Sequence, residues 1–135
     1  MAESFLDTNV LLRHLLADHP AQSPRATAYL RRVEDDELRV HLADTVVFET
    51  VFTLERTYHR SKESIRVALL PLIDLPGFVL PGKRRFHQVF DLYVDLNVSI
   101  AAAYHAVELL HRGLNEVTSF DRHFDRIPGV TRMEP

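Results

Sequence analysis

The 135-residue sequence contains no cysteine. This absence excludes a disulfide framework and any thiolate-ligated zinc or iron–sulfur site. The eight histidines offer no replacement, because none of them forms the His-x-x-x-His spacing of a helical metal pair. A metal site in this chain would therefore have to depend mainly on oxygen ligands from acidic side chains.

Long apolar runs are also missing. The longest, such as residues 67–73, is far shorter than the roughly 20 residues that a membrane-spanning helix needs. Asp7 interrupts the N-terminal stretch too early for a signal peptide. We therefore expect a cytoplasmic protein with no membrane association.

Several catalytic signatures are absent as well. The sequence has no glycine-rich phosphate loop, no Gly-x-Ser-x-Gly elbow and no cysteine nucleophile, which excludes the enzyme classes built on them. The formal net charge is −3, so the overall charge does not indicate nucleic-acid binding. Such binding would need a local basic patch, for which 31–32 and 83–85 are candidates, although short basic runs are more often solvated surfaces.

The composition is typical of one globular domain, 1–135, because 46% of the residues are hydrophobic and 26% are charged. Hydrophobic periodicity and turn residues predict an alternation of strands and helices. The predicted strands are 4–6, 38–42, 78–80, 116–120 and 130–133, and the predicted helices are 10–16, 25–37, 44–59, 61–73, 83–96, 99–112 and 121–126. Strands separated by helices do not easily pair as hairpins. We expect a three-layer α/β/α fold with a mostly parallel sheet of four to five short strands and helices on both faces.

Two aspartates directly follow predicted strands. Asp7 follows the first strand, and Asp121 follows the strand that ends in Thr118-Ser119-Phe120. The carboxyl ends of parallel strands lie on one edge of a sheet, where ligands gather. Each aspartate can instead cap the helix that follows it. The pair therefore indicates either a divalent-cation site or two helix caps.

A third acid lies within an apolar helix. Glu49 falls in the segment Val46-Val47-Phe48-Glu49-Thr50-Val51-Phe52, where a charged side chain has few solvated directions. A helical wheel places it on a narrow polar stripe with Thr45, Thr53 and Arg56. This stripe can face either the acidic edge or solvent.

Three segments together resemble a known family. They are Phe5-Leu6-Asp7-Thr8-Asn9-Val10-Leu11-Leu12, Phe48-Glu49-Thr50 and Thr118-Ser119-Phe120-Asp121-Arg122-His123-Phe124-Asp125-Arg126-Ile127-Pro128-Gly129-Val130. In this combination and order they resemble the PIN-domain superfamily, and within it the VapC toxins of VapBC toxin–antitoxin systems. The resemblance covers essentially the whole chain.

The resemblance implies a toxin that is a Mg²⁺- or Mn²⁺-dependent endoribonuclease. It implies that Asp7, Glu49 and Asp121 are catalytic metal ligands and that Asp125 contributes further. Thr8, Asn9 and Ser119 resemble the supporting polar residues of the family. The implied partners are an RNA substrate and an antitoxin of the VapB type, and VapC-like proteins tend to form homodimers.

One metal ligand of the family is missing here. The family has an aspartate at the start of a late helix, and Ala102 occupies that position in Ser99-Ile100-Ala101-Ala102-Ala103. With Ser99 as the N-cap, residue 102 falls in the first helical turn, where an acid would be favoured by the free amides. Asp91 or Asp95 could take this role instead, although both fall inside the preceding helix. We therefore expect a weak or inactive nuclease.

Other interpretations of these residues differ in class. An introduced substitution or natural decay could each explain Ala102, and the intact flanking residues favour the first. A non-catalytic PIN module that binds RNA or an antitoxin is the main functional alternative. A haloacid-dehalogenase-type phosphotransferase would need a second aspartate where Asn9 stands. A phospho-receiver domain would need a lysine near a late strand, but the only lysines are Lys62 and Lys83.

Overall fold

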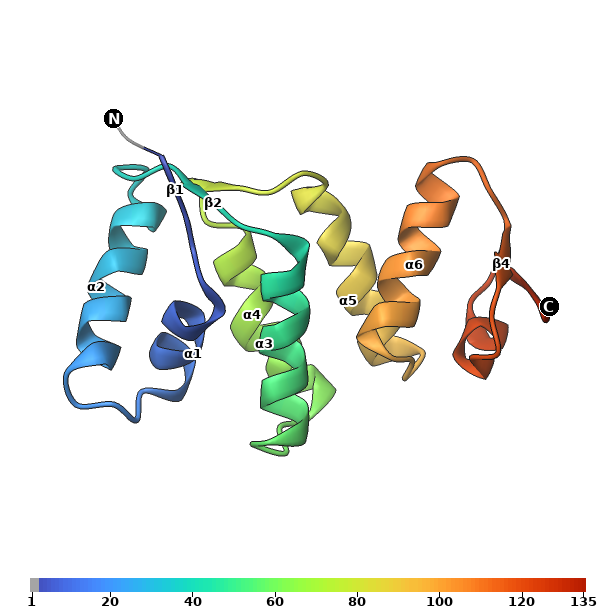
Figure 1. The fold of residues 1–135 in the computed structure, drawn as a ribbon, viewed down its shortest axis with the longest axis horizontal. Helices are drawn as coiled ribbons and strands as arrows, with labels where there is room; N and C mark the ends of the chain where they lie inside the picture. The colour runs from blue at the N-terminus through green and yellow to red at the C-terminus, as the bar shows by residue number, and fades with distance from the viewer. Residues whose placement is uncertain (1–2) are drawn as a thin grey trace. The chain divides into compact units, whose positions relative to one another are not determined.

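The chain forms two compact units in the computed structural model, which describes residues 3–135. The first unit is Met1–Lys83 and the second is Arg84–Pro135. Each unit contains its own strands and its own packed helices (Figure 1). The described strands pair only in parallel, so the predicted α/β class is confirmed. The five described strands form two separate sheets, one in each unit.

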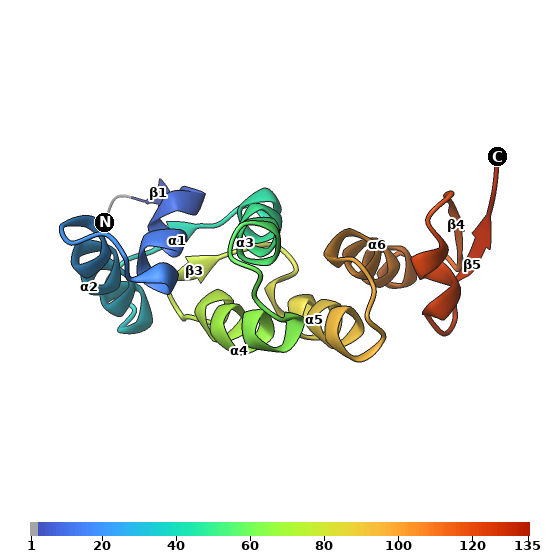
Figure 2. The same cartoon turned by 90° about the horizontal axis from the view of Figure 1, so that it is seen from below.

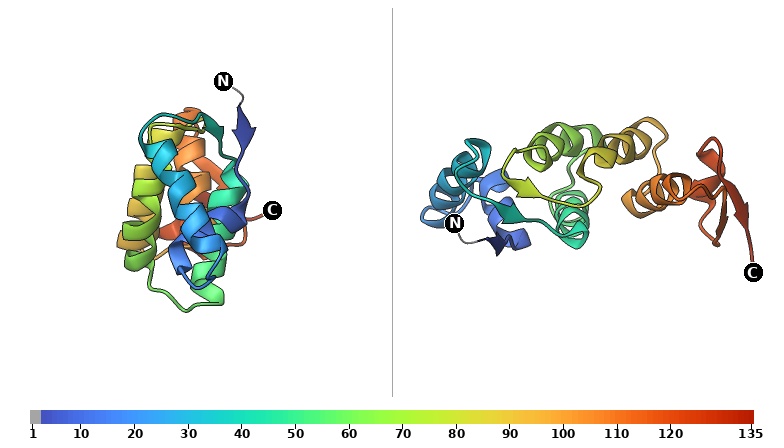
Figure 3. Two further views of the ribbon diagram at one scale, coloured as in Figure 1. Left: turned by 90° about the vertical axis from the view of Figure 1, so that its left-hand side faces the viewer. Right: turned by 90° about the horizontal axis from the view of Figure 1, so that it is seen from above.

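The first unit alternates strands with pairs of helices. Its elements are β1 (Ser4–Phe5), α1 (Thr8–Leu16), α2 (Gln22–Glu34), β2 (Val40–His41), α3 (Asp44–Arg56), α4 (Lys62–Ile73) and β3 (Phe78–Val79). The sheet order is β1-β2-β3, and helices α1 to α4 are arranged around these strands (Figure 3, right). Helix α1 packs against both α2 and α3. The end of β1 is therefore held directly beside helix α3.

A short 3-10 segment, Lys83–Arg85, spans the boundary between the two units, and the second unit continues with two helices. After Lys83–Arg85, its elements are α5 (Phe86–Asp95), α6 (Ile100–His111), β4 (Glu116–Thr118), a 3-10 helix η2 (Arg122–Arg126) and β5 (Thr131–Met133). Helices α5 and α6 pack together, and β4 and β5 lie side by side with η2 next to them (Figure 2). The 3-10 helix η2 also contacts α6, so the segment after β4 is placed against this helix.

Helix boundaries differ from the predicted ones for identifiable reasons. Helix α2 starts at Gln22 instead of Arg25, because Pro24 lies in the first turn, where no backbone N–H is needed. Helix α3 ends at Arg56 and does not reach His59, which has a positive φ of 52°. The helix begins at Asp44, and its N-cap is Ala43. Ser61 and the predicted N-cap Ser99 both accept a hydrogen bond from the third residue of their helix.

Strand β3 approaches the end of α2 very closely. The backbone N–H of Gly77 donates to the Val33 carbonyl at 3.0 Å, and the Gly77 carbonyl accepts from Val40 at 2.9 Å. A Cβ atom at residue 77 would lie 2.2 Å from the Leu38 carbonyl oxygen, a contact that real Cβ atoms do not make. Only glycine fits at this position, and it allows β2 and β3 to pair.

No helix within residues 3–135 has the length and apolarity required to cross a membrane.

Lys83 closes the turn that follows β3. Its Nζ donates to the carbonyl oxygens of Leu75 at 2.6 Å and Phe78 at 3.1 Å. Partial burial lowers the pKa of Lys83, and nearby Asp74 and Asp36 oppose this shift. This lysine from one of the two predicted basic runs is therefore occupied by a structural role.

We predict that Lys83→Met lowers the free energy of unfolding by about 1–3 kcal/mol, because it removes two charge-assisted hydrogen bonds and keeps the aliphatic stem. Urea unfolding followed by circular dichroism measures the change. Arg84→Met is the matched control, because it removes an exposed cation from the next residue. Equal stability of the two variants would show that the lysine does not stabilise the turn.

Candidate active site

Asp7 lies at the end of β1 and at the N-cap position of α1. Its backbone is extended, with φ −87° and ψ 153°, yet its carboxylate makes no capping hydrogen bond. The side chain is exposed and has no ion-pair partner within residues 3–135. The capping role that the sequence left open for Asp7 is therefore not used. Its carboxylate is available to bind a ligand.

Thr8 joins Asp7 to helix α3. The Thr8 side chain is only 7% exposed, and its Oγ1 donates to Glu49 Oε2 at 2.8 Å. Because Thr8 is the next residue after Asp7, this hydrogen bond brings the Glu49 carboxylate to the end of β1. Glu49 is exposed, as are Thr45 and Arg56 on the same stripe, so its polar stripe does reach the molecular surface.

Neither of these two acids has a cation beside it among the described residues. Arg56, which shares the Glu49 stripe, lies instead over the ring of Phe52 at 5.4 Å. The donor set of Asp7 and Glu49 consists of hard carboxylate oxygens, which suit Mg²⁺ and Mn²⁺. These two residues therefore fit a divalent cation by their chemistry. Within residues 3–135, no three acidic or histidine side chains form a ready-made metal cluster.

Asp121 follows β4 in the second unit, at the start of η2. Unlike Asp7, it does act as a cap, because its Oδ1 accepts from the backbone N–H of His123 at 2.9 Å. Ser119 supports this turn, since its Oγ accepts from the Asp121 N–H at 2.9 Å. The carboxylate is exposed, and its second oxygen has no hydrogen bond to the described residues.

His123 connects the Asp121 turn to helix α6, a role that the sequence analysis did not identify. Its Nδ1 accepts a hydrogen bond from the Ser99 backbone N–H at 3.0 Å. Asp121 Oδ1 lies 3.6 Å from the same nitrogen. Ser99 in turn caps α6 by accepting from the N–H of Ala102 at 3.1 Å. A continuous chain of contacts therefore links Asp121 to the first turn of α6. Because the link is tertiary, the histidine spacing in the sequence held no signal for it.

Ala102 is only 1% exposed at this helix start. It is the third residue of α6 and lies in the first helical turn, as the sequence predicts. An aspartate here would be buried, and a buried carboxylate needs a cation or hydrogen-bond donors to offset its desolvation. Asp91 and Asp95, the alternatives for this role, lie within α5.

Asp125 is engaged in an ion pair with Arg132. Its two oxygens accept from Arg132 Nε at 3.0 Å and Nη2 at 3.3 Å. These hydrogen bonds hold the pKa of Asp125 below its ordinary value, and they raise the pKa of Arg132. Arg132 also binds the Ser119 carbonyl at 3.1 Å. This geometry gives Asp125 a role in fastening η2 to β5, and its contribution to a metal site remains a prediction.

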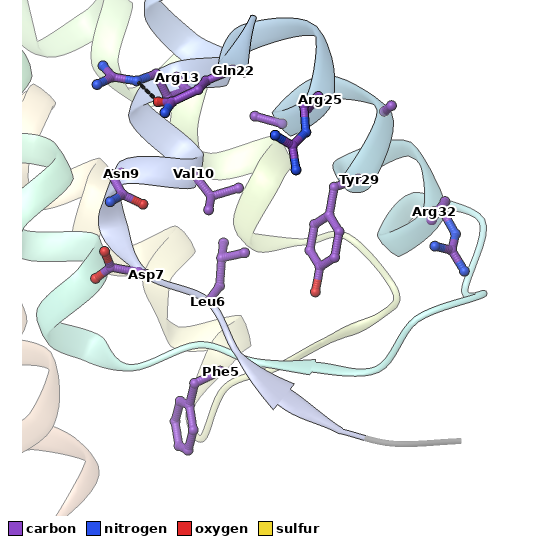
Figure 4. A pocket seen from close by; sticks show the side chains of 12 residues that line it. Phe5, Leu6, Asp7, Asn9, Val10, Arg13, Gln22, Arg25, Tyr29 and Arg32 are labelled. Atoms are coloured by element: carbon purple, nitrogen blue, oxygen red, sulfur yellow. Dashed lines mark hydrogen bonds between the residues drawn. The ribbon is translucent and has the colours of Figure 1, made fainter.

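A pocket opens next to Asp7, between the start of α1 and helix α2. Its volume is about 750 Å³ (Figure 4). Asp7 and Asn9 lie at one end, and arginines from α1 and α2 line the other side. The lining residues are Phe5, Leu6, Asp7, Asn9, Val10, Arg13, Gln22, Arg25, Ala26, Ala28, Tyr29 and Arg32. The sequence analysis placed a basic candidate at 31–32 and missed the combination of Arg25, Tyr29 and Arg32.

We predict that His123→Ala destabilises the chain by about 1 kcal/mol, because the Ser99 N–H loses its acceptor. Urea unfolding measures the loss, and the Ser99 amide resonance should shift in the NMR spectrum. His105→Ala removes an exposed imidazole from helix α6 and is the control. If the Ser99 resonance is unchanged in His123→Ala, the hydrogen bond is absent in solution.

We also predict a pH-dependent stability that comes from Asp125. Because its folded pKa is lowered, its stabilising contribution is complete above the ordinary aspartate pKa of about 3.9 and is lost as the pH falls through the folded pKa. Asp125→Asn should therefore unfold at a lower urea concentration than the unaltered chain at neutral pH, and this difference should disappear in acid. Asp18→Asn, which removes an exposed carboxylate, is the control. A difference that persists in acid would contradict the assignment.

Comparison with known proteins gives one family match. The PIN domain family matches residues 4–130, which include most of both units. A search of curated proteins finds no significant match. PIN domains have a nuclease-type fold, and the match contains every acidic residue considered above. The chain belongs to the PIN domain family.

Proposed function

We propose that this chain is the toxin of a type II toxin–antitoxin system, a VapC-type endoribonuclease that depends on Mg²⁺ or Mn²⁺. The proposal assigns Asp7, Glu49 and Asp121 as the acidic residues of the metal site. The observation that supports it most is the Thr8–Glu49 hydrogen bond of 2.8 Å, beside an Asp7 carboxylate that caps nothing. Two acids from different elements lie on either side of this hydrogen bond, and no basic side chain within residues 3–135 forms an ion pair with either of them. A divalent cation would find two carboxylates there that are not neutralised by the described residues.

The bound cation would activate water and neutralise the charge that develops on the phosphate during hydrolysis. The residues of the chain have separate roles in this scheme. Asp7 and Glu49 would bind the cation and orient the attacking water. The Thr8 hydroxyl, which donates to one Glu49 oxygen, fixes which of the two oxygens stays free. In the second unit, Ser119 and His123 hold the Asp121 turn through their hydrogen bonds. Asn9, in the first turn of α1, supplies a neutral polar group at the rim of the pocket.

Ala102 makes this copy weak or inactive in the proposal. The first turn of α6 is formed and capped, and His123 links it to Asp121, so the position expected for an acid is structurally intact. The side chain there is a methyl group that binds no cation. The same observation favours the second candidate function, a PIN module that binds RNA or an antitoxin without cutting.

The partners also belong to the proposal. They are an RNA substrate, an antitoxin of the VapB type and a second copy of the chain in a homodimer. We further propose that the protein acts in the cytoplasm, where its RNA substrate would be.

The test is Ala102→Asp. We predict that this variant cleaves a quenched fluorescent single-stranded RNA in Mg²⁺ or Mn²⁺ at least about 10-fold faster than the unaltered chain, because it regains a ligand. Adding Asp7→Asn should abolish the gain. The same variant should unfold at a lower temperature than the unaltered chain in EDTA, because the new carboxylate is buried, and Mn²⁺ should reverse this loss.

Ala101→Asp is the matched control, because it adds an acid one residue earlier in the same helical turn. It should gain neither cleavage nor Mn²⁺-dependent stability. If Ala102→Asp shows neither effect while it remains folded, the assignment of position 102 is wrong. Binding of RNA by the unaltered chain, without cleavage by Ala102→Asp, would favour the non-catalytic module.

A further inference from the structure

We propose that the pocket beside Asp7 is a groove for single-stranded RNA, in which Arg25 and Arg32 bind phosphates and Tyr29 stacks on a base. This inference rests on the proposed function, since it names the residues that select and orient its substrate. It is carried by the pocket itself, which joins an acidic end at Asp7 to a basic and aromatic wall on α2.

The wall follows from helix geometry. Arg25, Tyr29 and Arg32 are spaced at i, i+4 and i+7 in α2, so they share one face of the helix. Figure 4 shows their side chains along this face, with Leu6 and Val10 between them and Asp7. The adjacent face of the same helix buries Ala26, Leu30 and Val33 and anchors the wall, and Ala26 also lines the pocket.

The three arginines that line the pocket differ in whether their guanidinium groups are already hydrogen-bonded to other side chains. Arg25 is exposed and has no hydrogen-bond or ion-pair partner within the part of the chain that the structure describes. Arg32 makes one exposed ion pair, with Glu37 at 3.3 Å, and such pairs exchange easily for a phosphate. Arg13 is held by Gln22 at 2.7 Å and so shapes the groove rather than providing a free cation.

The chemistry of this wall fits single-stranded RNA better than an acidic peptide. Unpaired RNA bases stack on aromatic rings and guanidinium planes, while arginines bind the phosphates. Tyr29 is half-buried, so its ring is partly packed against the protein, and its hydroxyl lies 3.5 Å from Ser4 Oγ, at the limit of a hydrogen bond. A peptide of acidic residues would use the arginines but would gain little from a fixed aromatic face. The apolar floor of Leu6 and Val10 also suits a base more than a carboxylate.

The experiment measures binding of a short fluorescein-labelled single-stranded RNA to the intact chain by fluorescence anisotropy, in EDTA so that cleavage does not interfere. We expect Arg25→Ala and Arg32→Ala each to weaken binding and to reduce the slope of log K against log salt by about 0.7. Tyr29→Leu should weaken binding roughly 5-fold or more, and Tyr29→Phe should restore it.

Arg31→Ala is the matched control, because Arg31 is an exposed arginine of α2 that does not line this pocket. An equal loss of affinity in Arg31→Ala would show that only the general charge of α2 matters, and would overturn the proposal. So would displacement of the RNA by a glutamate peptide at an equal concentration of charge, since the groove would then accept any anion.

The two proposals fail in different ways. If Ala102→Asp cleaves RNA but the α2 variants bind like Arg31→Ala, the groove is wrong and the nuclease function stands. If the α2 variants lose affinity as expected and Ala102→Asp cleaves nothing, the groove stands and the nuclease function is wrong.

Discussion

The hydrogen bond from Thr8 to Glu49 is the interaction on which the candidate site depends. Thr8 belongs to the first turn of α1 and Glu49 to the second turn of α3, so 41 residues of sequence separate the two groups. Because the threonine is buried, its hydroxyl needs an acceptor, and the exposed carboxylate provides one. The bond therefore satisfies a folding requirement and at the same time sets an acid beside the end of β1. One hydrogen bond therefore contributes both to the stability of the fold and to the position of the Glu49 carboxylate.

The close approach at Gly77 supports this arrangement from the other side of the unit. Without a side chain at this residue, β3 can pair with β2, and β2 can pair with β1. The pairing register places Phe5 opposite His41, which aligns the end of β1 with the end of β2. Helix α3 starts three residues after His41, and this short connection limits where Glu49 can lie. The pairing of these strands thus limits where Asp7 and Glu49 can lie.

Sequence patterns predicted much of this fold because its signals are local. The two aspartates after strands and the N-cap Ser99 depend on residues within one turn, and the helix that Ser99 caps is present. The errors come from competing local rules: Pro24 was interpreted as a helix breaker, but it is tolerated in a first turn. The division of the strands between two sheets depends on pairing between distant residues. The nearest-neighbour pattern contains no information about such pairing.

The candidate site shows the same difference between local sequence signals and contacts that only the structure reveals. Asp7 and Asp121 look equivalent in sequence, since each follows a strand and precedes a helical segment. The structure distinguishes them, because Asp121 caps η2 through His123 while the Asp7 carboxylate caps nothing. The Asp121 and Glu49 carboxylates each accept one hydrogen bond, whereas no described residue donates one to the Asp7 carboxylate. The start of α6 is linked to the Asp121 turn, because the Ser99 N–H donates to His123 Nδ1 and the Ser99 hydroxyl accepts from the Ala102 N–H. Position 102 is therefore tied to the Asp121 turn by tertiary contacts, which no local sequence pattern could have predicted.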